Sequence, residues 1–175
     1  MLSFQCSHPE HALTNGIAMS LKRFLDIFPE VALPVTLTDE AARVFSQENG
    51  LVDQELLEHF VLPFEEEAPD EFTEFVPCFR IPATKDFHAL VYWRASLMKY
   101  QFILLTLDNN GHFIDRKTLA GTFSRENELW QSVATIDEDW EILVVSGRQS
   151  GGGWYDASAS TKTSMELLPE GHIVF

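Results

Sequence analysis

The sequence predicts an α+β domain in which two or three short N-terminal helices pack on a C-terminal antiparallel β-meander. Apolar residues recur at helical spacing within residues 1–64, whereas from residue 75 onward they alternate with polar residues, as in strands. Between these parts, residues 65–74 form an acidic, proline-containing connector, EEEAPDEFTE. We therefore expect a single domain over residues 1–175, with a mostly helical acidic segment, the connector and a meander over residues 75–175.

The N-terminal segment carries the patterns of three short helices. The first places Phe24 and Phe28 on one apolar face and stops at Pro29, because proline breaks a helix. The second follows Thr38, a good N-cap, and has two acids in its positive first turn. The third follows an aspartate that also suits an N-cap. The expected ranges are 17–28, 39–46 and 53–61.

After the connector, about eight runs rich in β-branched and aromatic residues are separated by short turns. Short connections force successive strands to run antiparallel. Asn110-Gly111 accepts positive φ and predicts a two-residue hairpin turn. Because a large open sheet leaves edges to protect, we expect a half-barrel, a barrel or a two-layer sheet. The expected strands are 75–81, 87–95, 100–107, 112–120, 130–136, 140–146, 157–168 and 172–175.

The chain is strongly acidic, with 27 acidic and 12 basic residues and a net charge of −15. Residues 1–74 hold fifteen of the acids and three of the bases, which is −12 of that charge. Such a charge is repelled by nucleic-acid backbones and anionic membranes, so we expect neither as a partner. It serves solubility, or it attracts a basic partner.

The cysteine content and the start of the chain predict the compartment. Two cysteines, Cys6 and Cys78, are too few for a disulfide framework. No basic, then apolar, leader opens the chain, and the apolar run FILLTL at 102–107 is far too short to cross a bilayer. We therefore expect a soluble, cytoplasmic protein.

The stretch GRQSGGGWYD at 147–156 is the part of the chain most typical of a binding site. A P-loop requires lysine where Gly153 stands, and the residues that follow alternate like a strand. The glycines therefore predict an irregular connection between two strands rather than a nucleotide site. Two interpretations stay open for Trp154 and Tyr155: they cover the end of the core, or with Arg148 they bind a ligand or partner.

A second candidate site lies on the first predicted strands. His88, Tyr92 and Arg94 share one face by alternation, and Arg80 projects from the preceding strand. Gathered in the mouth of a barrel, these groups would bind an anionic ligand. Otherwise they belong to a solvated sheet surface with their aliphatic stems packed down.

The sequence contains no pattern that specifies catalysis, a metal or a cofactor, so we expect none of them. Cys6, His8 and His11 are potential zinc ligands, but no second cluster follows at zinc-finger spacing.

These observations favour a non-catalytic binding or interaction module. One alternative is a small-ligand-binding β-barrel, with or without enzymatic activity, that uses the second candidate site. Another is an inhibitor or immunity-type protein whose acidic face, centred on residues 65–71, neutralises a basic partner. The partner is a protein or a small molecule, and its identity and the oligomeric state are left open.

Overall fold

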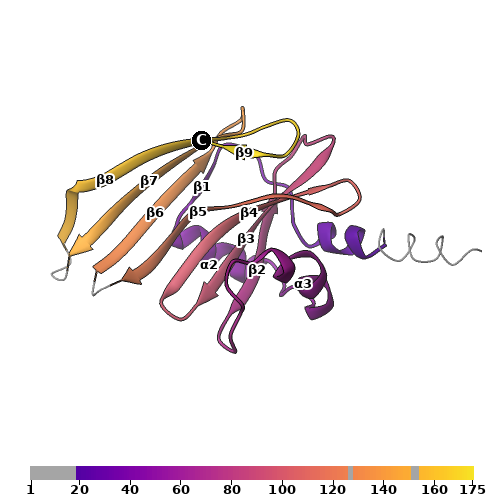
Figure 1. Ribbon diagram of the computed structural model, residues 1–175, viewed down its shortest axis with the longest axis horizontal. Coiled ribbons are helices and arrows are strands. Elements are labelled where there is room, and N and C mark those ends of the chain that lie inside the picture. Colours follow the sequence, from indigo (N-terminus) through magenta and orange to yellow (C-terminus); the bar gives the residue numbers. More distant parts are fainter. Residues whose placement is uncertain (1–18, 126–127, 151–153) are drawn as a thin grey trace, which may run out of the picture.

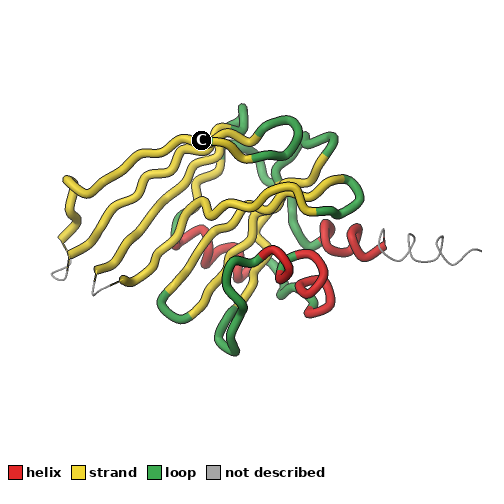
Figure 2. Tube along the Cα trace, in the orientation of Figure 1, coloured by secondary structure: helices red, strands yellow, loops and turns green. Residues whose placement is uncertain are grey.

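The computed structural model describes residues 19–125, 128–150 and 154–175 (Figure 1). Three short helices come first, and a nine-stranded antiparallel sheet follows. This confirms the predicted α+β class with its β-meander. The sheet is open and is not closed into a barrel (Figure 2).

The strands from β2 to β9 pair in the order in which they occur in the chain. This order follows from the short turns between the strands, because a short turn places each strand beside the one that follows it in the chain. The additional strand β1 pairs antiparallel with β6, with Thr36 opposite Thr135. The bounds are β1 Val35–Leu37, β2 Glu74–Arg80, β3 Phe87–Ser96, β4 Lys99–Asp108, β5 Phe113–Arg125, β6 Glu128–Ile136, β7 Glu141–Ser150, β8 Trp154–Leu167 and β9 Ile173–Val174.

The helices form where their caps predict. Residues 19–26 are helical, and α2 covers Asp39–Glu48, where the side chain of Thr38 accepts the N–H of the third residue at 3.2 Å. Helix α3 covers Gln54–Phe60, followed by a short 3₁₀ turn, Leu62–Phe64. Asp53 stands at the N-cap of α3 without a side-chain capping bond.

Helices α2 and α3 lie on opposite faces of the sheet (Figure 1) and belong to two separate core clusters. On the α3 side, Phe24 stacks on Phe60 at 4.8 Å and meets Phe28 edge-on, and all three are buried. This confirms the predicted burial of Phe24 and Phe28 against the sheet. On the other side, the apolar face of α2, with Ala42 and Phe45, joins a larger core to which β1 and the strands of the meander contribute.

Strand β5 belongs to two parts of the sheet. It pairs with β4 along most of its length but with β6 only through residues 121–125, and β1 takes the place beside the rest of β6. Gly121 is the point in β5 from which the strand pairs with both β4 and β6. A Cβ there would lie 2.1 Å from the carbonyl oxygen of Tyr100, so only glycine permits this close approach.

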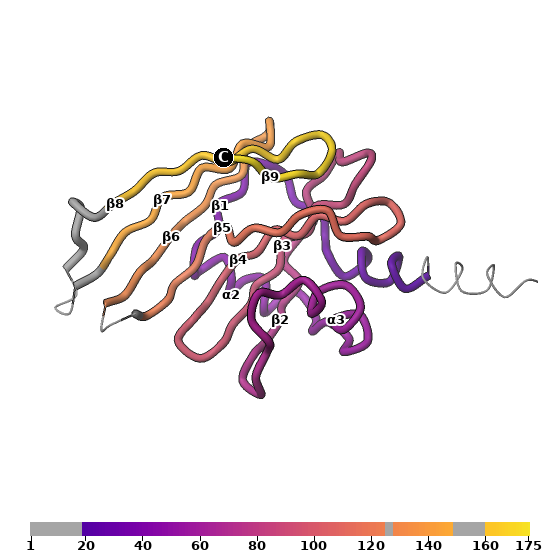
Figure 3. Tube along the Cα trace, viewed as in Figure 1, coloured from indigo at the N-terminus to yellow at the C-terminus, as the bar shows by residue number. Residues whose placement is uncertain are grey.

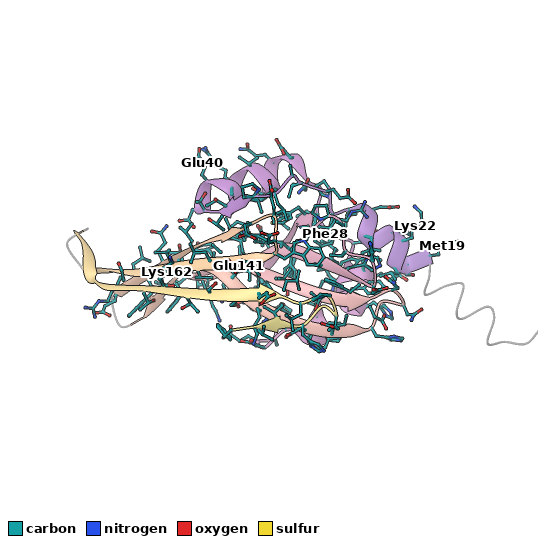
Figure 4. The ribbon with its side chains drawn as sticks, turned by 90° about the horizontal axis from the view of Figure 1, so that it is seen from above. Met19, Lys22, Phe28, Glu40, Glu141 and Lys162 are labelled. Carbon is teal, nitrogen blue, oxygen red and sulfur yellow. The ribbon has the colours of Figure 1, made fainter. Side chains whose placement is uncertain are left out.

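The outer ends of β5 to β8 extend beyond α2 (Figures 1 and 3). In the perpendicular view, the sheet that carries Lys162 continues past Glu40, which lies in the first turn of α2 (Figure 4). This projecting end leaves side chains on the α2 face of β6 and β7 partly open to solvent, among them Val145.

The turn after β4 differs from the predicted two-residue hairpin. Gly111 has positive φ, as predicted, but three residues separate Asp108 from His112, whose backbones are hydrogen bonded at 2.8 Å. The reason is the carboxylate of Asp108, which accepts the N–H groups of Asn110 and His112 at 2.8 Å each and so stabilises the longer turn. The turns after β6 and β8 share this backbone pattern, with Trp140 and Gly171 at the positive-φ position.

The glycine-rich stretch also differs from the prediction. Instead of an irregular connection over 147–156, β7 continues to Ser150 and β8 begins at Trp154. A shift in the β7–β8 register after Ser146 accommodates the glycine that follows it, and pairing resumes at Arg148. Backbone pairing with β6 and β8 therefore overrides the weak strand preference of glycine.

Candidate functional site

The four side chains of the second candidate site do not meet in one cavity. His88, Tyr92 and Arg94 do alternate along β3, but Arg94 lies six residues after His88, a distance of about 20 Å along the strand. One end of the face therefore reaches a small pocket and the other reaches the acidic connector. The open sheet provides no barrel mouth to gather them.

At the connector end, Tyr92 and Arg94 enclose the carboxylate of Glu65. Arg94 Nε lies 2.9 Å from one oxygen of Glu65, Arg116 Nη2 lies 3.1 Å from the other, and the hydroxyl of Tyr92 donates to the carboxylate. All of these side chains are at least 90% buried. Burial, followed by the charge of Glu65, raises the pKa of Tyr92. The cluster fixes the connector to the sheet.

The acids next to Glu65 also have basic partners. Glu66 pairs with Arg116 at 3.1 Å, and Glu67 pairs with Lys99 at 2.8 Å. The hydrogen bond from Lys99, with its charge, lowers the pKa of Glu67. All three consecutive acids therefore pair with bases of the sheet: Glu65 is buried, and Glu66 and Glu67 are exposed at its rim.

At the other end of β3, Arg80 and His88 line a pocket of about 180 Å³. Arg80 is already paired with Glu30, which also lines the pocket, at 3.2 Å. Burial, and then the charge of Arg80, lowers the pKa of His88. The pocket is thus small and contains its own counter-charge, which makes it a poor acceptor for an anion.

Arg148 lies on β7 and is engaged by neighbouring strands. Its guanidinium is 3.2 Å from a carboxylate oxygen of Glu128 and 5.9 Å from the centre of the Trp130 ring. The side chains of Trp154 and Tyr155, predicted to cover the core or to bind, lie outside the described residues.

A groove of about 430 Å³ lies between the N-terminal turn of α2 and strands β6 and β7. Its apolar floor is Val133 and Val145, which are opposite each other in the β6–β7 register, and Val145 is 44% exposed. Lys162 stands opposite Val145 on β8, so it marks the outer side of that floor. The lining residues are Thr38, Asp39, Glu40, Gln131, Val133, Val145, Ser146, Gly147 and Arg148.

Asp39 and Glu40 form the acidic wall of the groove. Gln131 Nε2 donates to Asp39 Oδ2 at 2.8 Å, and the hydroxyl of Thr122 donates to Oδ1 at 3.3 Å. Neutral groups from β5 and β6 thus hold this carboxylate, and no basic side chain of the described residues forms an ion pair with it. Glu40 is 79% exposed and reaches only Arg43, at 3.4 Å.

The remaining candidates for catalysis or metal binding are the cysteine thiols and clusters of His, Cys, Asp and Glu side chains. Cys78 is buried, and burial raises the pKa of its thiol, which makes it a poor nucleophile. Within the described ranges, no three His, Cys, Asp or Glu side chains come together as metal ligands. Cys6, His8 and His11 lie outside these ranges.

Comparison with protein-family models, with curated proteins and with solved structures found no match. In the part of the chain that the structure describes, no helix combines the length and the apolar character needed to span a bilayer.

Proposed function

We propose that the protein is a non-catalytic binding module that holds an extended, basic segment of a partner protein in the groove beside α2. The observation that carries this proposal is the combination of a partly exposed apolar floor, Val133 and Val145, with an acidic wall, Asp39 and Glu40. The volume of about 430 Å³ is within the range of ligand sites.

Lysine and arginine side chains suit such a groove because they carry a charged head on an aliphatic stem. A stem that crosses the floor covers Val145, and its head then reaches Asp39 or Glu40. Lys162, opposite Val145 on the outer side, repels a cation and so favours the direction toward α2. Arg148, which also lines the groove, is paired with Glu128 at 3.2 Å, so its charge is compensated there. The net charge of −15 would draw a basic segment to the protein from a distance.

Isothermal titration of the full chain with blocked, extended peptides tests this function. The probes are peptides of alternating threonine and a charged residue: arginine, lysine or glutamate. We expect saturable binding of the basic peptides, weakened by added salt because the attraction is electrostatic. Binding of the glutamate peptide, or of none of the three, would refute the proposed function.

Matched variants test whether the groove is the site. Val145→Lys introduces a charge into the floor and should abolish binding, whereas Val44→Lys alters a residue of similar exposure, 41%, that does not line the groove. Glu40→Gln should lower affinity several-fold and Glu48→Gln should not, although both remove one acid from α2. Equal effects within either pair would place binding elsewhere.

A further inference from the structure

We infer that the groove selects arginine over lysine, with Asp39 as the acceptor of the guanidinium. This inference rests on the proposed function and specifies the chemistry of its central contact. The carboxylate of Asp39 already accepts hydrogen bonds from Gln131 and Thr122, and it can accept more.

An ionised carboxylate accepts about four hydrogen bonds, two at each oxygen. In Asp39, Gln131 donates to Oδ2 at 2.8 Å, and the Thr122 hydroxyl lies 3.3 Å from Oδ1 and 3.5 Å from Oδ2. The hydroxyl has a single proton, so it fills one acceptor position, on the nearer Oδ1. Each oxygen therefore keeps one acceptor position. Two adjacent acceptors on one carboxylate match the two parallel N–H groups of a guanidinium, whereas an ammonium bonds as a single point charge.

Asp39 is exposed, but hydrogen bonds from the sheet orient its carboxylate before any partner arrives. The residue opens α2 next to its N-cap, Thr38, and the two groups that hold its carboxylate come from adjacent strands, with Thr122 opposite Gln131. A bidentate contact depends on such a fixed acceptor, because the angles of both hydrogen bonds must be right together. Asp39 thus meets the geometric requirement for arginine recognition.

Glu40 provides the internal comparison. Its side chain is 79% exposed, and its one basic neighbour of the described residues, Arg43, follows three positions later on the same helix. An exposed carboxylate that no neighbouring strand orients attracts arginine and lysine alike. The discrimination is therefore assigned to Asp39, and Glu40 contributes only general attraction.

The test compares the arginine and lysine peptides on the wild-type chain and on Asp39→Asn. We expect the arginine peptide to bind the wild type roughly tenfold more tightly, the effect of a second charge-assisted hydrogen bond. Asp39→Asn should remove this preference, whereas Glu40→Gln should weaken both peptides by the same factor. Thermal unfolding of each variant establishes that α2 is intact.

A second variant leaves the charge of Asp39 in place. Gln131→Met removes the amide that orients the carboxylate. The ratio of the dissociation constants of the lysine and arginine peptides should therefore fall toward one, while the lysine peptide still binds. If both basic peptides bind the wild type equally, or if Asp39→Asn weakens them equally, the inference is wrong and the proposed function stands. If neither peptide binds the wild type, the proposed function and the inference are both wrong.

Discussion

Neutralising Glu65 is the most direct test of how the connector is held. Glu65→Gln preserves the shape of the side chain but removes the negative charge between Arg94 and Arg116. The side chain of Glu65 is 2% exposed, and those of the two arginines are 4% and 7% exposed. Two cations would then share a buried site in which only Glu66 and Glu67, at the exposed rim, compensate them.

The expected cost follows from these contacts. Breaking a buried ion pair by removing one partner destabilises a protein by about 3–5 kcal/mol, because it leaves an uncompensated buried charge. The amide oxygen of glutamine still accepts a hydrogen bond, which restores about 1 kcal/mol. We therefore expect Glu65→Gln to lower the free energy of unfolding by about 2–4 kcal/mol.

Urea unfolding followed by tryptophan fluorescence measures this change. With a denaturant slope of about 2 kcal/mol per M, the midpoint should fall by roughly 1–2 M. Glu66→Gln is the matched control, because Glu66 also lies 3.1 Å from Arg116 but is 78% exposed, and it should cost less than about 1 kcal/mol. A Glu65→Gln midpoint equal to that of Glu66→Gln would refute the argument that burial makes this cluster stabilising.

Three further predictions concern the helical layer and the turn after β4. Phe24→Ala should cost about 3–5 kcal/mol in urea unfolding, because it empties a buried ring site; an unchanged midpoint would contradict the docking of the first helix. Gly111→Val should cost at least about 1 kcal/mol, because φ is +86° and a Cβ would lie 3.1 Å from Phe60, whereas Gly50→Val, with open space around it, should cost less. Although burial favours the neutral acid, hydrogen bonds from His112 and from a backbone N–H lower the pKa of Asp108 to about 2, so its contribution to stability is complete above its usual pKa of 3.8 and is lost as pH falls toward 2. Asp108→Asn should flatten that part of the acid unfolding curve, and an unchanged curve would show that this carboxylate does not stabilise the turn.

The elements that could be predicted from the sequence are those with local causes. The helix after Thr38 and the antiparallel meander follow from caps, periodicity and short turns, which act within a few residues. The two-residue turn was wrong because the hydrogen bonds of the Asp108 carboxylate outweighed the turn preference of Asn-Gly. The turn after β6 has the same geometry, with Trp140 at φ +66°. Because this position is not a glycine, the sequence does not indicate its positive φ.

The candidate sites depended on contacts that lie far apart in the chain. Alternation correctly placed Tyr92 and Arg94 on one face of β3. Their contacts with Glu65, which lies 27 residues before Tyr92, are not indicated by any periodic pattern in the sequence. From the sequence alone, Asp39 is only a favourable residue for a helix N-terminus. Its hydrogen bond comes from Gln131, 92 positions later, and no local pattern could have predicted that contact.

The pairing of β1 with β6 has a consequence for how the protein is made. Thr36 and Thr135, whose hydroxyls are 3.1 Å apart, are separated by 99 positions, whereas the other strand pairings in the described sheet join consecutive strands. During synthesis, each hairpin from β2 onward can close soon after its second strand leaves the ribosome, but β1 must wait for β6, and closing so long a loop is slow. Because α2 follows β1 directly, the groove is assembled only when the two ends of this long loop meet. A nascent or truncated chain that lacks β6 therefore has the acidic wall but no floor, and it cannot engage a basic partner prematurely in the way proposed here.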